Sequence, residues 1–336
     1  MILTDFDPLP WTENADGEPR RVGVEMEMAG VEPERMAEAV TATLGGRYQA
    51  ESAFSGTVKD TELGDFGVEL DASVLTSRRY LDSLQSLGIE IEEGQARDNL
   101  EDLLSRVAGM VVPHELVCPP VEIESLPAID AIRERLRRAG ALGTHSAAVY
   151  AFGLQFNIDI ASTRVDHLLA VLRAFFIRFD AICERERIDL ARKLTPFVQS
   201  FPEDYVAHVL DAAYHPRDVA ELIDDYLDYT PTRNRPLDLL PLFAWLDRER
   251  VMSAPVERHL IKPRPAWHYR LPNCLIDDRD WSLARPWREW VGIERLAADP
   301  DRLTRRSRQR FDDSSGFRRW ASALFRDIGR RIGWRG

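Results

Sequence analysis

The feature of the sequence that most constrains its fold is a strict alternation of side-chain types at residues 21–29, RVGVEMEMA. Apolar side chains occupy every second position, and Glu25 and Glu27 lie between them. Because successive side chains of a β-strand point to opposite faces, this run predicts a strand with one apolar and one acidic face. Such a strand is typical of an antiparallel sheet that is packed on one side and polar on the other.

The same alternation predicts further strands along the chain, at residues 56–60, 66–71, 113–118, 152–160 and 266–272. Apolar residues at intervals of three and four predict helices, at residues 33–44, 99–108, 129–139, 164–228 and 237–245. This mixture indicates the α+β class. We expect an antiparallel sheet of about five to six strands, with helices packed on its apolar face.

Composition divides the chain into three parts. Residues 1–20 are polar and predict an irregular lead-in, and residues 21–300 form the body that holds the expected strands and helices. Residues 301–336 contain eleven Arg and four acidic residues, and their apolar side chains recur at helical spacing. They predict a basic amphipathic C-terminal helix. We expect it to dock on the body or on a partner; contact with an anionic membrane surface is the weaker alternative.

Charge and cysteine content exclude several classes of protein. The formal net charge of −12 argues against nucleic acid as a partner. The three cysteines are widely spaced, which indicates neither a disulfide framework nor a zinc ribbon. No stretch approaches the roughly 20 apolar residues of a membrane helix, and no signal-peptide pattern opens the chain. We therefore expect a cytoplasmic protein.

The polar faces of the expected strands carry an unusual set of side chains. They comprise Glu25, Glu27, Glu69, Asp71, Glu115, Gln155, Asn157, His268 and Arg270. The alternative is a merely solvated face, but such a face usually mixes charges of both signs. Glu25 and Glu27 lie about 6.6 Å apart along one face, and they repel unless a cation bridges them. Carboxylate oxygens favour Mg²⁺ or Mn²⁺; a hydrolase could instead use the pair as acid and base.

Two arginines in a proline-bounded loop are further candidates. Arg233 and Arg235 flank Asn234. Their planar guanidinium groups suit a carboxylate or phosphate, and surface salt bridges are an equal alternative. No GxxxxGK[ST] loop or Rossmann glycine pattern is present, so residue spacing alone does not identify a nucleotide site.

The order of these motifs resembles the amidoligase family, distant relatives of glutamate–cysteine ligase and glutamine synthetase. The motifs are GVEMEM, VELDAS, HELVCPP, GLQFN, RNRP and WHYRL, and the resemblance covers residues of about 20 to 290. It implies a curved antiparallel sheet, bound ATP and Mg²⁺ (or Mn²⁺), and phosphorylation of a substrate carboxylate to an acyl phosphate. An amine then attacks the acyl phosphate to form an amide.

The resemblance also implies roles for individual residues. Glu25 and Glu27 correspond to metal ligands, Glu115 to a further metal or substrate carboxylate, and Arg270 to the arginine that stabilises phosphate. We assign the remaining polar-face and loop residues accordingly: Glu69 and Asp71 to metal, Asn157 to catalysis, and Gln155, Arg233, Arg235 and His268 to the cofactor. Relatives often carry histidines in a GxHxH strand where this chain has Gln155 and Asn157, which puts one metal or phosphate contact in doubt.

The sequence therefore predicts an ATP-dependent carboxylate–amine ligase that acts on small-molecule or peptide carboxylates and amines. By the resemblance, a partner of the glutamine amidotransferase type is possible. Two alternatives stay open at this point. One is a carboxylate-dependent hydrolase that needs no ATP, and the other is a degenerate, non-catalytic binding protein, which the missing histidines would explain.

Overall fold

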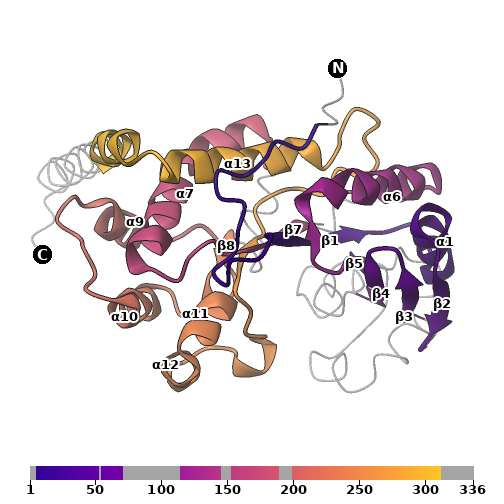
Figure 1. The fold of residues 1–336 in the computed structure, drawn as a ribbon, viewed down its shortest axis with the longest axis horizontal. Coiled ribbons are helices and arrows are strands. Elements are labelled where there is room, and N and C mark those ends of the chain that lie inside the picture. Colours follow the sequence, from indigo (N-terminus) through magenta and orange to yellow (C-terminus); the bar gives the residue numbers. More distant parts are fainter. Residues whose placement is uncertain (1–4, 53, 71–113, 145–152, 189–198, 312–336) are drawn as a thin grey trace, which may run out of the picture.

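The structure, a computed structural model, describes residues 5–52, 54–70, 114–144, 153–188 and 199–311. Nine described strands form one antiparallel sheet with helices packed against it (Figure 1). The strand order is β2-β3-β4-β5-β1-β7-β9-β8, and β6 also pairs with β1. The strands are β1 (Arg21–Met28), β2 (Arg47–Ala50), β3 (Gly56–Thr61), β4 (Gly64–Leu70), β5 (His114–Val117), β6 (Val121–Glu122), β7 (Leu154–Asp159), β8 (Leu237–Asp238) and β9 (Ala266–Tyr269). The predicted α+β class is confirmed, with more strands than the five to six expected.

The first alternating run forms the strand that was expected of it. The side chains of Val22, Val24, Met26 and Met28 are all fully buried, and those of Glu25 and Glu27 are partly exposed on the other face. β1 pairs with β5 on one side and β7 on the other. It is therefore an inner strand, and its two faces set the two faces of the sheet.

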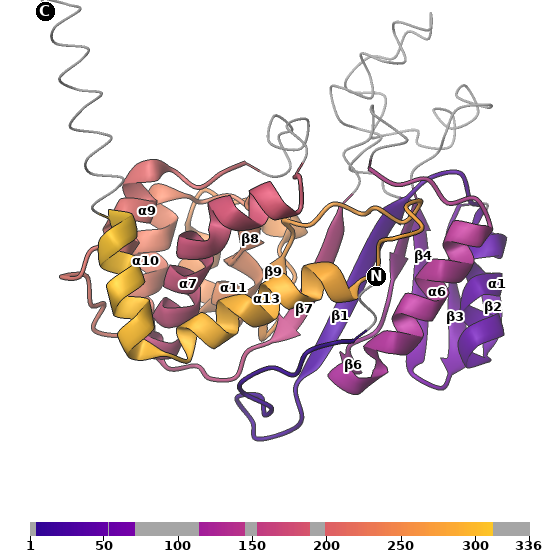
Figure 2. The same ribbon diagram turned by 90° about the horizontal axis from the view of Figure 1, so that it is seen from above.

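Helices cover the apolar face. They include α1 (Pro33–Leu44), α6 (Leu126–Arg138), α7 (Val165–Arg185) and α13 (Ala284–Ala297). Figure 2 shows α6, α7 and α13 lying over the same side of the strands. The ring of Phe156 in β7 meets that of Trp287 at 5.7 Å, and the ring of Tyr269 in β9 meets that of Trp290 at 5.3 Å. Aromatic burial of this kind contributes a large share of the free energy of folding.

The remaining helices lie beyond β9 and α7. They are α9 (Glu203–Leu210), α10 (Val219–Tyr229), α11 (Leu240–Leu246), α12 (Arg248–Ser253) and the 3₁₀ turn η2 (Arg258–Leu260). A second 3₁₀ turn, η1 (Ile123–Ser125), joins β6 to α6. None of the described helices combines the length and apolar character needed to cross a bilayer.

One predicted helix was wrong at its start. Residues 237–245 were expected to be helical, but Leu237–Asp238 form strand β8 and the helix α11 begins at Leu240. The backbone of Leu237 pairs with Tyr269, and the Asp238 carboxylate accepts a hydrogen bond from the Leu240 N–H at 3.0 Å. Pairing with β9 and this side-chain hydrogen bond together outweigh the local apolar pattern, which is a weak guide over so short a stretch.

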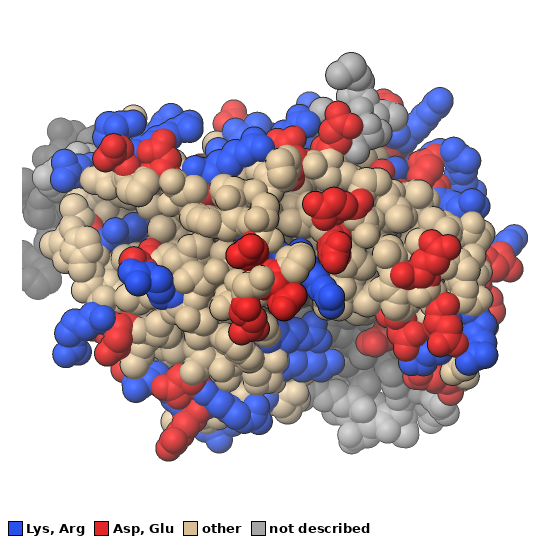
Figure 3. All heavy atoms as spheres, in the orientation of Figure 1, with Lys and Arg blue, Asp and Glu red and all other residues tan. Residues whose placement is uncertain are grey.

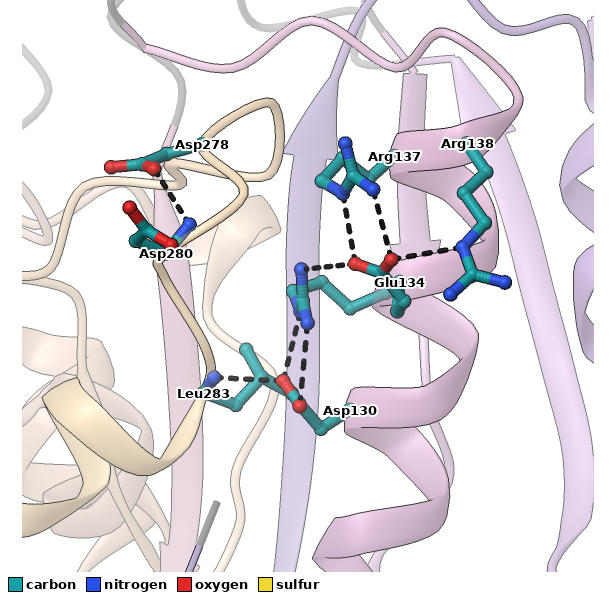
Figure 4. Close-up of polar contacts among 8 residues, drawn as sticks. Asp130, Glu134, Arg137, Arg138, Asp278, Asp280 and Leu283 are labelled. Atoms are coloured by element: carbon teal, nitrogen blue, oxygen red, sulfur yellow. Dashed lines mark hydrogen bonds and ion pairs between the residues drawn. The ribbon is translucent and has the colours of Figure 1, made fainter. Parts of the chain in front are cut away.

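A network of charged side chains fixes α6 (Figure 4). Glu134 accepts hydrogen bonds from three arginines of the same helix, Arg133, Arg137 and Arg138. The hydrogen bond from Arg137 is the main cause that lowers the pKa of Glu134 to about 2. Asp130 accepts from the Leu283 N–H at 2.9 Å, which ties α6 to the segment entering α13.

The lead-in is irregular, as expected, and it is held firmly on α13. The Trp287 indole donates to the Asp7 carbonyl at 2.9 Å. Arg20 forms a two-point ion pair with Glu294, with both hydrogen bonds at 2.7 Å and both side chains 1% exposed. Arg20 also donates to the Asp159 carbonyl at 2.7 Å. One buried guanidinium therefore joins the lead-in, β7 and α13.

Several expectations lie outside the described residues. These are Asp71, the helix at 99–108 and the apolar stripe of the tail beyond residue 311. Of the predicted C-terminal helix, the described part at 301–311 is helical.

We predict that Glu294→Gln lowers the free energy of unfolding by about 3 kcal/mol, because it leaves the Arg20 guanidinium buried without a counter-charge. Urea unfolding measures this loss. Glu38→Gln is the matched control: its ion pair with Arg35 is exposed, so it should leave the free energy of unfolding nearly unchanged. Equal effects of the two substitutions would contradict the structural role given to Arg20.

Candidate active site

Three carboxylates lie in one row across the polar face of the sheet. Glu69 in β4 is directly opposite Glu115 in β5, and Glu115 is directly opposite Glu27 in β1. Residues opposite each other in antiparallel strands share a face, with Cβ atoms about 5 Å apart. Like charges so placed repel one another, which favours a cation over this row. We call Glu69, Glu115 and Glu27 the carboxylate row.

A chain of amide hydrogen bonds lies next to the carboxylate row. Glu25 is opposite Gln155, and Gly23 is opposite Asn157. The Asn157 amide donates to Glu25 Oε1 at 2.6 Å, and the Gln155 amide donates to Asn157 Oδ1 at 2.7 Å. A Cβ on residue 23 would lie 3.4 Å from the Asn157 Cβ, so glycine leaves this amide room to reach Glu25.

Arginines gather on the far side of the amides. His268 in β9 is opposite both Asn157 and Asp238, and Arg270 follows on the same face. The Arg270 guanidinium donates to the Arg233 carbonyl at 2.9 Å. Burial, followed by the positive charge of Arg264, lowers the pKa of His268 to about 3. This histidine is therefore neutral at physiological pH and serves as a hydrogen-bonding group without charge.

A buried carboxylate sits among these arginines. Asp238 is 1% exposed, and burial raises its pKa to about 6 against the opposing charges of Arg270 and Arg233. Its Oδ2 atom lies 3.5 Å from the Arg233 Nε atom. Asp238 thus lies within reach of the loop that carries Arg233 and helps to set the position of that guanidinium.

The polar face is consequently divided by charge along the order of the strands. Carboxylates occupy β4, β5 and β1, the amides of Gln155 and Asn157 occupy β7, and His268 with the nearby arginines occupies the β9 side. On that side, Asp159 at the end of β7 and the buried Asp238 of β8 add two further carboxylates. Such an arrangement suits a ligand with a cation at one end and anionic oxygens at the other.

A cavity of about 560 Å³ opens over the N-terminal half of β1. Gly23, Glu25 and Asn157 line it from the sheet, and Arg21 and Arg264 line it from two sides. Residues of the lead-in complete its wall. In Figure 3, acidic side chains gather near the middle of the visible face, where Figure 1 shows the lead-in crossing. The volume is within the range of small-molecule sites.

The carboxylate oxygens of the row are suitable ligands for a hard divalent cation, but they do not converge on one point. Within the described ranges, no group of three or more His, Cys, Asp or Glu side chains is arranged to hold a metal ion. Glu27 Oε2 accepts a hydrogen bond from the Gly153 N–H at 2.6 Å. Carboxylate rotamers would have to change to bring oxygens of two or three row members onto one cation.

Arg235 is placed differently from the other candidates. Its guanidinium donates to Thr230 and, at 2.6 Å, to the Ser200 carbonyl, and it lies over the Phe201 ring at 5.7 Å. These contacts tie its loop to the segment before α9. The structure brings Arg233 to the polar face and uses Arg235 to hold the loop.

Sequence reasoning missed Arg21, Arg264 and Asp238. Arg264 has the same strand parity as His268 and Arg270, so extending the alternation backward past Pro265 would have found it. Asp238 was hidden in a stretch that was predicted to be helical. Cys118, which follows β5, is buried and lines the cavity; its burial, followed by the charge of Glu25, raises its pKa.

A comparison with known protein families identifies the chain. The model of the family described as "Putative amidoligase enzyme" matches residues 18–292, so the chain belongs to this family. The predicted resemblance is thereby confirmed. No curated protein and no solved structure matches the chain.

We predict that His268→Gln makes the protein less sensitive to acid. Below pH 6.5 the unfolded chain binds a proton at His268 that the folded protein does not bind until about pH 3, so the wild type loses stability as the pH falls. This loss should be about 2 kcal/mol between pH 7 and 5. Asp238 has the opposite sign, since its raised pKa costs stability as the pH rises toward 6.

Urea unfolding of both proteins at pH 7 and pH 5 measures the difference. Asp238 is present in both, so its contribution largely cancels in the comparison. An identical loss of stability on acidification in the wild type and in His268→Gln would show that the folded protein protonates this histidine normally.

Proposed function

We propose that this protein is an ATP-dependent carboxylate–amine ligase that forms an amide through an acyl phosphate. Family membership supports the ligase class. The observation that carries the finer assignment is the charge division of the polar face, with three carboxylates in register at one end and arginines at the other. ATP with a divalent cation has the complementary distribution of charge.

Glu27, Glu115 and Glu69 are the residues that would hold Mg²⁺ or Mn²⁺. Asp71, also expected as a ligand, lies outside the described residues, and Glu25, expected as another, is engaged by the Asn157 amide. The cation, when bound, supplies neutralisation of phosphate charge. The carboxylate oxygens are of the type that both ions prefer. The repulsion within the row is relieved when the cation binds, so binding should also stabilise the fold.

The reaction requires activation because a carboxylate is a poor electrophile. The γ-phosphoryl group of ATP passes to an oxygen of the substrate carboxylate, and ADP leaves. The amine nitrogen then attacks the acyl carbon. The C–N bond forms, the bond from carbon to the phosphate oxygen breaks, and inorganic phosphate leaves while the nitrogen loses a proton.

The arginine side of the face suits the phosphate groups. The guanidinium of Arg270 can hold two oxygens of the transferring phosphoryl group at once. Such an oriented donor stabilises the transition state most strongly in a site shielded from water. Arg233 and the neutral His268 add donors to the nucleotide. Gln155 and Asn157 hold Glu25 in place through their hydrogen bonds and can contact the nucleotide or acyl group. We do not assign Arg235 to the nucleotide, because its guanidinium is engaged in hydrogen bonds that hold the loop.

We place the enzyme in the cytoplasm, where ATP and Mg²⁺ are abundant, and propose small-molecule or peptide carboxylates and amines as its substrates. Hydroxylamine is a useful substitute for the unknown amine because it attacks any acyl phosphate and leaves a hydroxamate, which forms a coloured complex with added ferric iron. A mixture of amino acids and peptides serves as the carboxylate donor.

We predict that Glu27→Gln reduces ADP and hydroxamate formation by about a hundredfold or more, since it removes charge from the centre of the carboxylate row. Mn²⁺ should raise the melting temperature of the wild type and not of Glu27→Gln. The control Glu38→Gln, on the exposed side of α1, should behave as the wild type. Turnover that persists in Glu27→Gln, or that needs no ATP in the wild type, would refute the ligase assignment.

We further predict that Arg270→Lys loses nearly as much turnover as Arg270→Ala, about a hundredfold, although both proteins fold. Lysine keeps the charge but lacks the planar fork that binds two oxygens. Turnover and melting temperature are measured for both variants, with Arg217→Lys on the exposed surface as the control. High activity in Arg270→Lys would mean that only charge is needed, as in a structural ion pair with Asp238.

A further inference from the structure

The 560 Å³ cavity lies at a defined place relative to the carboxylate row. Along β1, the side chains on the polar face are those of Glu27, Glu25, residue 23 and Arg21, in that order. Each step is about 6.6 Å along the strand. The cavity begins at Glu25 and extends over Gly23 to Arg21, away from the carboxylate row.

The far end of the cavity carries two guanidinium groups, with the carboxylates of Asp159 and Glu18 in the same lining. Arg21 comes from β1 and Arg264 from the segment before β9, and both side chains are exposed. Neither guanidinium forms an ion pair with a residue in the described ranges. Two guanidinium groups that line one cavity from two sides suit a carboxylate.

Two acidic residues, Asp159 and Glu18, also line the cavity, and neither forms an ion pair with Arg21 or Arg264. The Asp159 carboxylate accepts a hydrogen bond from the Arg21 backbone N–H at 2.9 Å. Burial raises the pKa of Asp159, and this hydrogen bond and the charges of Arg20 and Arg21 oppose that rise. Glu18 is exposed on the lead-in at the rim. Glu25, by contrast, lies on the floor at the end nearest the carboxylate row, with Asn157 donating to one of its oxygens.

We infer that this cavity is the binding site for the amine substrate and that this substrate carries a carboxylate, as a free amino acid or a short peptide does. The inference rests on the proposed function, because the amine must face the acyl phosphate beside the carboxylate row. Its ammonium group then lies at Glu25, and its carboxylate lies between Arg21 and Arg264. A simple alkylamine or an amide lacks the group that these two arginines recognise.

The length of the cavity agrees with an acceptor of this size. Four residue steps along β1 separate Arg21 from Glu25, about 13 Å between their Cα atoms. The side chains of both residues extend into this gap and leave room for a molecule of a few heavy atoms in length. Gly23 lies on the floor of the cavity, where a Cβ would make ordinary van der Waals contact with Asn157 at 3.4 Å.

Binding can be tested without turnover, by saturation-transfer NMR on the full chain without ATP or metal. One probe mixture contains the twenty common L-amino acids and their glycyl dipeptides, and the other contains the corresponding C-terminal amides. We expect signals from members of the first mixture and none from their amides. Arg264→Ala and Arg21→Ala should each weaken binding by about tenfold or more, because each removes a charge-assisted contact.

Arg217→Ala, which removes an exposed arginine on the far side of the molecule's helical part, is the control and should bind as the wild type. Both test arginines are exposed, so their substitution should leave the fold intact, which the melting temperature checks. Equal binding of acids and amides, unchanged binding in both variants, or no binding by the wild type would overturn the inference. ADP formation by the wild type is measured separately, so absent turnover with intact, arginine-dependent binding would count against the ligase alone.

Discussion

The antiparallel register of β1 is the constraint on which the rest of the structure depends. Because β1 is paired on both sides, its alternation is imposed on the whole sheet. The apolar side chains must face the helices, where the rings of Phe156 and Tyr269 meet α13. The acidic side chains must then face the other way. A slip of one residue would bury Glu25 and Glu27, so the core and the carboxylate row are specified by the same pairing.

The site follows from this pairing together with one buried ion pair. Register brings carboxylates from three strands into one row and places the amides of β7 beside them. Arg20, held by Glu294, fixes the lead-in against α13 and β7, and the lead-in supplies a wall of the cavity. A segment without regular structure thereby contributes to the site, because its backbone is anchored where the apolar core ends.

Much of the fold could be predicted because alternation is a local property of the chain. The strands β1, β5, β7 and β9 and the direction of Glu25, Glu27 and Asn157 follow from residue spacing alone. Which residues become neighbours could not be predicted, because register depends on pairing between distant segments. The opposition of Glu69, Glu115 and Glu27 is of this kind. Arg233 and Arg235 have different surroundings because of where their loop meets residues 199–201, which the sequence does not show. The short strand β8 has too few residues to show an alternating pattern.

The central claim is that the carboxylate row holds a divalent cation, and diffraction from crystals soaked in Mn²⁺ tests it most directly. The account predicts an anomalous difference peak over the row, with oxygens of Glu27 and Glu115 at about 2.1 Å from it. Glu69 should complete the protein ligands. Two results would contradict the account. One is the absence of anomalous density over the carboxylate row in crystals whose lattice leaves the row accessible to solvent. The other is an anomalous peak that lies only at another place in the molecule.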